Sequence, residues 1–430
     1  MRYEEAMEYI ASTSRFGMNF GLDRVKAMLS HLGNPQNDFK CIHIAGTNGK
    51  GSTTAMISSI LKEEGYTIGM YTSPYLEEFE ERIQVNGVNI PKEKLASLVT
   101  EIKDIIESVI ADGFDDPTQF EIITTLMFLY FSREKIDYAV IEVGLGGRLD
   151  ATNVIDNPLI SVIASISKDH MNILGNTIKE IAFEKCGIIK NTSVISYPQV
   201  SEAMEVIEEV CIKRGVTLIK TNLGDIKEVV SNKERNTQII TYNLNGREVE
   251  VEHTLLGDHQ VKNTLVAINV IDEFSKKVRK ISDDTIKNGL SKAKWIGRME
   301  VMKKTPLVVI DGAHNLDGIN SLKNSVSKYF NYKNIILVLG ILGDKEVEKM
   351  VSDISEISKF IILTEPHNDR AKSIDEMGEY LEKLEKPYEK ILDYEKAYKK
   401  ALEIAGKDDL ILVCGSLYMI GDMRTVIKNS

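Results

Sequence analysis

A glycine-rich loop, Gly46-Thr47-Asn48-Gly49-Lys50-Gly51-Ser52, stands between a predicted strand and a predicted helix. The apolar run Cys41–Ala45 predicts the strand, and apolar residues at helical spacing predict a helix over Thr53–Glu64. Small residues here let backbone N–H groups approach phosphate oxygens, and the helix N-terminus adds its positive end. Lys50 supplies a mobile positive charge and Ser52 a hydroxyl. The loop therefore predicts a site for the phosphates of ATP.

The loop departs from the usual phosphate-loop pattern at two positions. Ile44 stands where that pattern has glycine, and Gly51 separates Lys50 from the hydroxyl residue. The alternative interpretation is a glycine-rich turn without a ligand. The order of strand, loop, lysine and helix favours phosphate binding.

Composition limits the other possibilities. The chain has 430 residues, more than one hydrophobic core usually serves, so we expect two domains. Its 53 basic and 64 acidic residues give a net charge of -11, which argues against a nucleic-acid partner. No apolar run approaches the roughly 20 residues that cross a bilayer, and the start carries no signal pattern. The cysteines are scattered, without metal-binding spacing. We expect a cytoplasmic monomer.

Alternating strand and helix patterns predict the fold class. Near-continuous apolar runs at Tyr138–Val143 and Leu159–Ile166 are typical of strands buried on both faces of a parallel sheet. The stretch 216–253 has a hairpin pattern, which predicts a small β layer appended to this sheet. A second alternation begins at Leu307–Ile310. The prediction is α/β with two doubly wound domains, residues 1–295 and 296–430, joined by a linker near Ala293–Arg298.

Polar residues follow three predicted strands. Ser73 follows Thr67–Thr72, Glu142 ends an apolar strand, and His170 follows the strand over 159–166. In an open α/β sheet, ligands lie outside the carboxyl ends of the strands. A carboxylate there suits Mg²⁺, although a histidine ligand is unusual for this hard cation, and Mn²⁺ could satisfy the same set. Each residue alone is more simply explained as solvated, but their shared position favours a metal site.

The chain resembles the Mur ligase superfamily, in particular its folylpolyglutamate synthase/dihydrofolate synthase branch, because six motifs occur in the order found in that family. They are Gly46–Ser52, Thr72-Ser73-Pro74, the run from Glu142 to Asn153, Glu184-Lys185-Cys186-Gly187, Asp311-Gly312-Ala313-His314-Asn315 and Cys414-Gly415-Ser416. The resemblance covers nearly the whole chain. It implies a phosphate-loop ATPase-like central domain with an added β layer, and a Rossmann-like C-terminal glutamate ligase domain.

The resemblance also implies a reaction. ATP would transfer its γ-phosphoryl group to the carboxylate of dihydropteroate or a reduced folate, giving an acyl phosphate. The amine of L-glutamate would then attack, forming an amide and releasing phosphate. Catalysis of the first step would consist mostly of positioning and charge neutralisation by Lys50 and the metal.

The resemblance assigns the metal and lysine roles. Ser73, Glu142 and His170 are implied to be Mg²⁺ ligands. Lys185 is implied to carry a carbamate made with CO₂, an anion able to hold a second metal ion. The residue alone would favour a surface lysine on a helix over Ile178–Cys186.

Other residues are assigned to ATP and glutamate. Asp311 is implied to lie on the nucleotide side and His314 near the incoming glutamate, with Ser416 also contacting glutamate. Arg298 is implied to reach the ATP phosphates. Gln260 and Asn263 resemble residues near the adenine or ribose, although a helix cap is an equal alternative for Asn263.

The pterin pocket is assigned to four residues, Phe120, Glu121, Asp150 and Ala151, with Gly17–Phe20 as a further candidate. A buried carboxylate suits the amino and N–H donors of a pterin ring. Phe120 also fits a core position on its helix. Asp150-Ala151 resembles the bacterial bifunctional pattern, which leads to the hypothesis that both dihydrofolate synthesis and folate polyglutamylation occur.

Two other functions compete with this one. A Mur-type ligase acting on another carboxylate, such as a UDP-linked peptide, usually carries a further domain before the phosphate loop, and 45 residues precede Gly46. A non-catalytic nucleotide-binding module would need the loop but not Lys185, His170 and His314 together.

Overall fold

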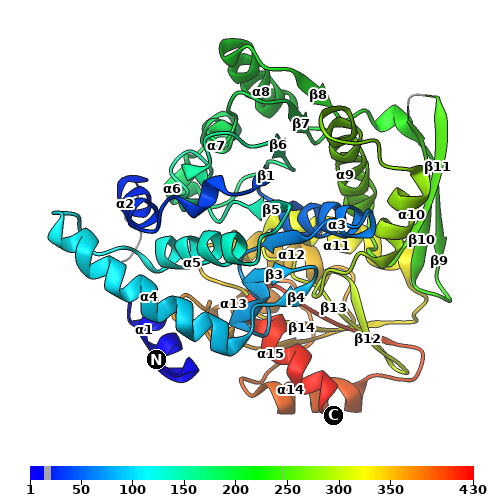
Figure 1. Ribbon diagram of the computed structural model, residues 1–430. Coiled ribbons are helices and arrows are strands. Elements are labelled where there is room, and N and C mark those ends of the chain that lie inside the picture. Colours follow the sequence, from blue (N-terminus) through cyan, green and yellow to red (C-terminus); the bar gives the residue numbers. More distant parts are fainter. Residues whose placement is uncertain (14–20, 245) are drawn as a thin grey trace. The chain divides into compact units, whose positions relative to one another are not determined.

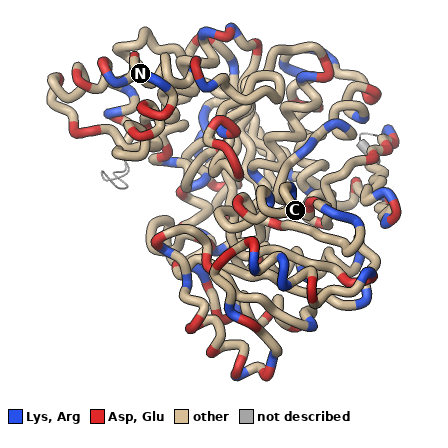
Figure 2. The backbone as a smooth tube through the Cα atoms, turned by 90° about the horizontal axis from the view of Figure 1, so that it is seen from below, with Lys and Arg blue, Asp and Glu red and all other residues tan. Residues whose placement is uncertain are grey.

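The computed structural model describes residues 1–430 except 14–20 and 245. The chain divides into two compact units. The first consists of Met1–Tyr75, Phe79–Leu223 and Lys262–Lys292, and the second of Leu76–Glu78, Gly224–Val261 and Ala293–Ser430. In the described part of the chain, no helix is both long and apolar enough to span a bilayer. Figure 2 shows that acidic and basic residues are interspersed along the backbone.

The first unit is built on an eight-stranded sheet with the order β4-β3-β2-β5-β1-β6-β7-β8. Its strands are β1 (Lys40–Ala45), β2 (Ile68–Tyr71), β3 (Ile83–Val85), β4 (Val88–Asn89), β5 (Tyr138–Glu142), β6 (Ile160–Ile163), β7 (Val194–Ser196) and β8 (Leu218–Lys220). Neighbours pair in parallel from β2 to β8, whereas β3 and β4 add an antiparallel hairpin at one edge. The sheet is therefore mixed, and its carboxyl edge gathers the ends of β1, β2, β5 and β6.

Helices cover both faces of this sheet, as its apolar strands require. They are α1 (Tyr3–Ser12), α2 (Asp23–His31), α3 (Lys50–Glu63), α4 (Lys92–Ala111), α5 (Gln119–Arg133), α6 (Met171–Leu174), α7 (Ile178–Cys186), α8 (Ser201–Arg214) and α10 (Asp283–Lys292). Helices α4 and α5 lie side by side, as do α7 and α8 (Figure 1). Burying the apolar side chains of α5, such as Phe128 and Phe131, supplies much of one core.

A separate three-stranded antiparallel sheet has the order β11-β10-β9. Its strands are β9 (Ile226–Asn232), β10 (Thr237–Leu244) and β11 (Arg247–His253). The pairing of β10 with β11 confirms the predicted hairpin strands. This β layer is not attached to the eight-stranded sheet, contrary to our prediction, and it falls within the second unit. Helix α9 (Asp258–Lys277) follows it, beginning in the second unit and continuing into the first.

The second unit also contains a six-stranded sheet with the order β12-β13-β17-β14-β15-β16. Its strands are β12 (Glu300–Lys304), β13 (Leu307–Ile310), β14 (Ile335–Leu339), β15 (Phe360–Leu363), β16 (Tyr388–Lys390) and β17 (Leu410–Cys414). Its helices are α11 (Leu316–Tyr329), α12 (Val347–Ser355), α13 (Ile374–Lys383), α14 (Tyr394–Ile404) and α15 (Leu417–Lys428). All pairs are parallel except β12 with β13, which confirms the second doubly wound sheet.

Candidate active site

The phosphate loop connects the carboxyl end of β1 to α3. The helix begins at Lys50, three residues before the predicted start, so Lys50, Gly51 and Ser52 form its first turn. Gly49 is the residue before the helix and has a φ of 81°, a left-handed conformation that glycine adopts without steric cost. The loop therefore presents the N-terminus of a 14-residue helix, where backbone N–H groups and the helix dipole favour an anion.

Hydrogen bonds from Thr47 and Asn48 to the segment after β6 hold the loop in place. The Thr47 N–H donates to the Ser165 carbonyl at 2.6 Å, and the Thr47 hydroxyl donates to the Ser167 carbonyl at 3.0 Å. Asn48 Nδ2 donates to the Ser167 hydroxyl at 3.3 Å. The segment that precedes His170 is thus bound directly to the phosphate loop.

Lys50 and Lys185 meet at one carbonyl oxygen. Lys50 Nζ donates to Gly46 O at 3.1 Å, and Lys185 Nζ donates to the same atom at 2.8 Å. Lys50 Nζ also lies 3.8 Å from Glu142 Oε1. Burial, with the positive charge of Lys50 as a second cause, lowers the pKa of Lys185 to about 7. A fraction of Lys185 is therefore an uncharged amine at neutral pH.

Two close backbone approaches fix the end of α7 that carries Lys185. A Cβ atom at Gly147 would lie 2.8 Å from the Lys185 carbonyl oxygen, and one at Gly187 would lie 2.3 Å from Arg148 Cα. The Arg148 N–H donates to the Glu184 carbonyl at 2.8 Å, and the two side chains form an ion pair at 2.9 Å. The glycine run after β5 therefore packs directly against the Lys185 backbone.

Two of the three predicted metal ligands lie together. The Ser73 N–H donates to Glu142 Oε2 at 3.3 Å, and the Glu142 carboxylate is buried at 4% exposure. His170 follows β6 and has a φ of 49°, a conformation uncommon outside glycine and enriched at functional positions. The buried Glu142 carboxylate, 3.8 Å from Lys50 Nζ of the phosphate loop, would suit a small divalent cation, which prefers oxygen ligands.

Of the four predicted pterin residues, Phe120, Asp150 and Ala151 lie at or next to the loop after β5, whereas Glu121 contacts Arg24. The Phe120 ring packs on Gly144, where an added Cβ would lie 2.3 Å from Phe120 Cζ. Asp150 accepts hydrogen bonds from the Leu145 N–H at 2.8 Å and the Thr152 hydroxyl at 2.5 Å, and burial raises the pKa of its carboxyl. Phe120 and Asp150 thus both contact the loop after β5, and Ala151 is buried next to Asp150. The candidate segment Gly17–Phe20 lies outside the described residues.

Glu121 already has partners. Its Oε2 atom accepts from Arg24 Nε at 3.1 Å and from the Thr118 N–H at 2.7 Å, the latter as part of the capping box of α5. Its Oε1 atom lies 3.0 Å from Arg24 Nη2 in an ion pair. A buried, paired carboxylate that caps a helix explains this residue structurally.

Asn263 lies over the phosphate loop. Its Oδ1 atom would be 2.6 Å from a Cβ added at Gly49. Asn263 occupies the second turn of α9, so the alternative prediction that it caps a helix is wrong. Gln260, in the first turn of the same helix, is fully buried.

The second unit gathers its predicted residues at the carboxyl end of β13. The Asp311 carboxylate accepts from the N–H groups of Met299 and Ala313, both at 2.8 Å. Burial raises the pKa of Asp311, and the positive charge of Arg298 partly offsets this. His314 Nδ1 lies 2.7 Å from the Gly312 carbonyl oxygen. Ser416 follows β17, the parallel neighbour of β13, and its buried hydroxyl has no hydrogen-bond partner among the described residues.

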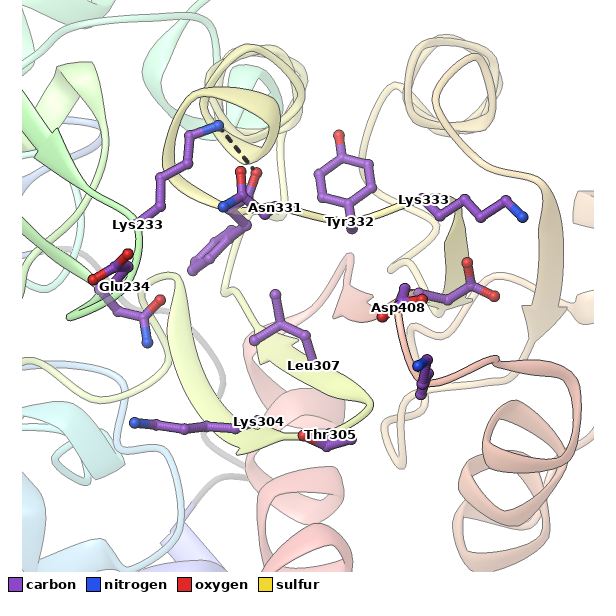
Figure 3. A pocket seen from close by; sticks show the side chains of 13 residues that line it. Lys233, Glu234, Lys304, Thr305, Leu307, Asn331, Tyr332, Lys333 and Asp408 are labelled. Carbon is purple, nitrogen blue, oxygen red and sulfur yellow. Dashed lines mark hydrogen bonds between the residues drawn. The ribbon is translucent and has the colours of Figure 1, made fainter.

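A cavity of about 650 Å³ lies elsewhere in the second unit (Figure 3). It borders the amino ends of β13, β14 and β17, whereas the predicted residues follow carboxyl ends. Lys233 beside it donates to the Phe330 carbonyl at 3.3 Å. None of the predicted site residues lines this cavity.

Three supporting residues were not found from the sequence. His43 Nε2 lies 2.9 Å from the Thr152 hydroxyl, which in turn contacts Asp150, and Arg24 pairs with Glu121. His43 could have been noticed in the sequence because it is a polar residue within the apolar run Cys41–Ala45. Arg24 gave no local signal because its partner lies 97 residues away.

Comparison with known proteins agrees with this fold. Residues 44–271 match the family model of the Mur ligase middle domain, and residues 297–417 match that of the Mur ligase, glutamate ligase domain. With a phosphate loop after β1 and two α/β units, these matches define the class as an ATP-dependent Mur ligase.

Individual relatives narrow the class. The dihydrofolate synthase/folylpolyglutamate synthase of Bacillus subtilis is 36% identical over 432 residues, covering 99% of each chain. The structure of Mycobacterium tuberculosis folylpolyglutamate synthase complexed with ADP has a TM-score of 0.91 and 26% identity, covering 99% of each chain. A folylpolyglutamate synthase complex with AMPPCP and folate has a TM-score of 0.88 and 32% identity, covering 99% of this chain and 100% of that one. The chain belongs to the folylpolyglutamate synthase/dihydrofolate synthase family of Mur ligases.

Proposed function

We propose that this enzyme uses ATP to join L-glutamate to the carboxylate of a folate-type acceptor. The acceptor carboxylate oxygen attacks the γ-phosphorus, ADP leaves, and an acyl phosphate forms. The glutamate amine then attacks the acyl carbon, phosphate leaves, the nitrogen loses a proton, and an amide remains. The observation that carries this proposal is the arrangement of Lys50 and Lys185 at the Gly46 carbonyl, beside the buried carboxylate of Glu142.

The nucleotide is proposed to lie with its phosphates at the N-terminus of α3. The backbone from Gly46 to Ser52 would donate to phosphate oxygens, and Lys50 would place its ammonium beside the β- and γ-phosphates. Asn263, packed over Gly49, is proposed to contact the adenosine together with Gln260.

A magnesium ion is proposed at Ser73, Glu142 and His170, and Mn²⁺ would suit the histidine equally. When bound, it would neutralise charge on the phosphate oxygens. Glu142 and Ser73 support this site because the Ser73 N–H donates to the Glu142 carboxylate, so the two residues lie together at the ends of the adjacent strands β2 and β5.

Lys185 is proposed to be carbamylated. The uncharged amine attacks CO₂, a proton is released, and a carbamate anion replaces the ammonium group. The lowered pKa, about 7, supports this step because only the unprotonated amine is nucleophilic. The carbamate would then offer oxygen ligands beside the phosphate loop.

Residues of the second unit are proposed to bind ATP and glutamate. Arg298 and Asp311 would face the nucleotide, while His314 and Ser416 would contact the glutamate. The support is that Arg298 acts electrostatically on Asp311 and that the buried Ser416 hydroxyl is unpartnered among the described residues.

Both dihydropteroate and tetrahydrofolate are proposed as acceptors. Phe120 and Asp150 support a pterin site because they converge on the loop after β5, with Ala151 beside them. Glu121 is the weaker member, because pterin contact would compete with Arg24.

The two predicted domains are proposed to bind different substrates. Residues 1–295 would bind ATP and the pterin, and residues 296–430 would bind glutamate. The two family models, which end at residue 271 and begin at residue 297, support this division. We further propose a monomer that has small-molecule substrates only and a cytoplasmic location, where its four free, buried cysteines stay reduced.

The test measures ADP release by purified protein with Mg²⁺ and glutamate. Dihydropteroate, tetrahydrofolate and a UDP-linked peptide would be supplied in parallel. ADP release with both pterins and not with the UDP-linked peptide is expected. ADP release with tetrahydrofolate alone would show that the enzyme does not make dihydrofolate. ADP release with none of the three acceptors would overturn the proposed function.

A further inference from the structure

A three-residue segment of the second unit interrupts the first. Leu76–Glu78 belongs to the second unit, whereas Tyr75 and Phe79 on either side belong to the first. The segment packs on α15 so closely that a Cβ added at Gly421 would lie 1.9 Å from the Leu76 carbonyl oxygen. Only glycine at position 421 permits this approach.

One face of α15 receives the segment. Gly421, Arg424, Thr425 and Lys428 follow one another at helical spacing and share that face. Arg424 Nη1 donates to Glu77 Oε2, and the Thr425 hydroxyl donates to Glu77 Oε1 at 3.3 Å. Lys428 Nζ donates to both Glu77 oxygens, at 2.8 and 3.0 Å. Glu77 is thus held by three side chains of one helix.

Arg424 also holds a second loop. Its Nε and Nη2 atoms donate to Glu300 at 3.0 and 2.7 Å, which is the bidentate geometry of a guanidinium–carboxylate pair. Glu300 in turn accepts from the Gly297 N–H at 2.8 Å. The Arg424 side chain is only 12% exposed, so solvent screens these pairs weakly.

Each carboxylate lies near a proposed site residue. Glu77 follows Ser73 by four residues, and Glu300 follows Arg298 by two. The Gly297 carbonyl accepts from the Gly312 N–H at 2.7 Å, so Gly297, the residue before Arg298, is bound through both its N–H and its carbonyl. Arg424 is therefore the common partner of the chain next to a proposed metal ligand and the chain next to a proposed phosphate ligand.

We propose that Arg424 is a positioning residue for the ligation reaction, a role that rests on the proposed function. By binding Glu77 and Glu300 at once, it holds the segment Leu76–Glu78, which follows Ser73 in the chain, and the loop that carries Arg298. It contacts no substrate. Because a misplacement of about 1 Å can reduce turnover on the order of 100-fold, such a clamp controls kcat more than substrate affinity.

Arginine is required for this arrangement. A lysine ammonium is a single point of charge and cannot form the bidentate pair with Glu300 while also reaching Glu77. The competing explanation is that the cluster only stabilises the fold. That explanation predicts a lower Tm with normal turnover per folded molecule.

The experiment compares Arg424→Met and Arg424→Lys with Lys428→Met. The control removes the half-exposed partner of Glu77 and leaves Arg424 intact. Steady-state kinetics with tetrahydrofolate would be combined with amide hydrogen exchange of peptides covering 74–82 and 296–301. We expect kcat to fall about 30-fold in both Arg424 variants, with KM for ATP within about threefold, and faster exchange in both peptides. Lys428→Met should differ from wild type by less than about twofold.

Unchanged exchange in the Arg424 variants would overturn the clamp. Faster exchange with unchanged kcat would overturn the positioning role and leave a structural one. Hydrogen exchange needs no substrate, so it reports on the clamp even if wild-type enzyme releases no ADP with any folate. That last result would contradict the proposed function rather than the contact.

Discussion

Lys50 and Lys185 share one hydrogen-bond acceptor, the carbonyl oxygen of Gly46. Burial is the main cause of the lowered Lys185 pKa, and repulsion from the Lys50 ammonium group on the same oxygen adds to it. With its pKa lowered to about 7, a fraction of Lys185 is an uncharged amine at neutral pH.

Lys185→Ala should abolish turnover without removing ATP binding. Carbamate formation needs the Lys185 amine, whereas the phosphate loop stays intact in the variant. We expect kcat to fall at least about 100-fold, with the Kd of AMPPCP, measured by titration calorimetry, within about threefold of wild type. Lys179→Ala, on the exposed surface of the same helix, is the control. Near wild-type turnover in Lys185→Ala would remove the carbamate from the mechanism.

The stability contributed by Lys185 should depend on pH in a defined direction. Its pKa is lowered from 10.5 to about 7 on folding, so the unfolded chain binds more protons between these values, and the Lys185 contribution becomes less unfavourable as pH rises through that window. Lys185→Met should therefore raise the free energy of unfolding by about 1–3 kcal/mol at pH 7 and by less at pH 9.5. Urea unfolding in CO₂-free buffer measures this. A gain that is constant or larger at pH 9.5 would contradict the lowered pKa.

Gly49→Ala should weaken both folding and nucleotide binding. An added Cβ meets Asn263 Oδ1 at 2.6 Å, and the φ of 81° is unfavourable for alanine. We expect a loss of about 2–3 kcal/mol in unfolding free energy and weaker AMPPCP binding. Gly33→Ala isolates the backbone term, because its φ is 79° and nothing lies within 4 Å.

The double variant Gly49→Ala/Asn263→Ala separates the steric term. Removing the Asn263 side chain should recover part of the stability lost in Gly49→Ala but none of the adenosine contact. If Gly49→Ala costs no more than Gly33→Ala, Asn263 does not pack on the loop in solution.

Thr152→Val should impair the use of dihydropteroate. The Thr152 hydroxyl donates to Asp150, so His43 Nε2 must donate to Thr152, and the lowered His43 pKa, about 3 because of burial, keeps that ring neutral. Without the hydroxyl, Asp150 loses a hydrogen bond and its pKa rises further. We expect kcat/KM for dihydropteroate to fall about tenfold, with Thr152→Ser near wild type. A loss in Thr152→Ser with near wild-type kcat/KM in Thr152→Val would show that the methyl packing, not the hydroxyl, matters.

Local patterns predicted the parts of the site that lie at strand ends. The apolar runs ending near Ala45, Thr72 and Glu142 placed the phosphate loop, Ser73 and the carboxylate on one sheet edge, because parallel strands share a direction. The helix Ile178–Cys186 was predicted with its observed bounds.

The features that the sequence did not predict depend on contacts between residues far apart in the chain. The sequence of the β9–β11 layer has a clear hairpin pattern. That pattern does not indicate whether the layer joins another sheet. Likewise, Glu121 pairs with Arg24 and Glu77 with Arg424, over separations of 97 and 347 residues. Charged side chains at such distances give no periodic signal, so only the folded chain reveals them.

The path of the backbone limits how this protein can be divided. Neither unit is a continuous stretch, since Leu76–Glu78 and Gly224–Val261 belong with the C-terminal residues. A fragment beginning at Ala293 would leave the basic face of α15 without Glu77, and Gln238 would be missing from its 2.8 Å hydrogen bond with the buried Tyr329 hydroxyl. Gene fusions, split-protein reporters and domain exchanges that cut near residue 295 would therefore yield a C-terminal half with exposed, unpaired surfaces rather than a self-sufficient module.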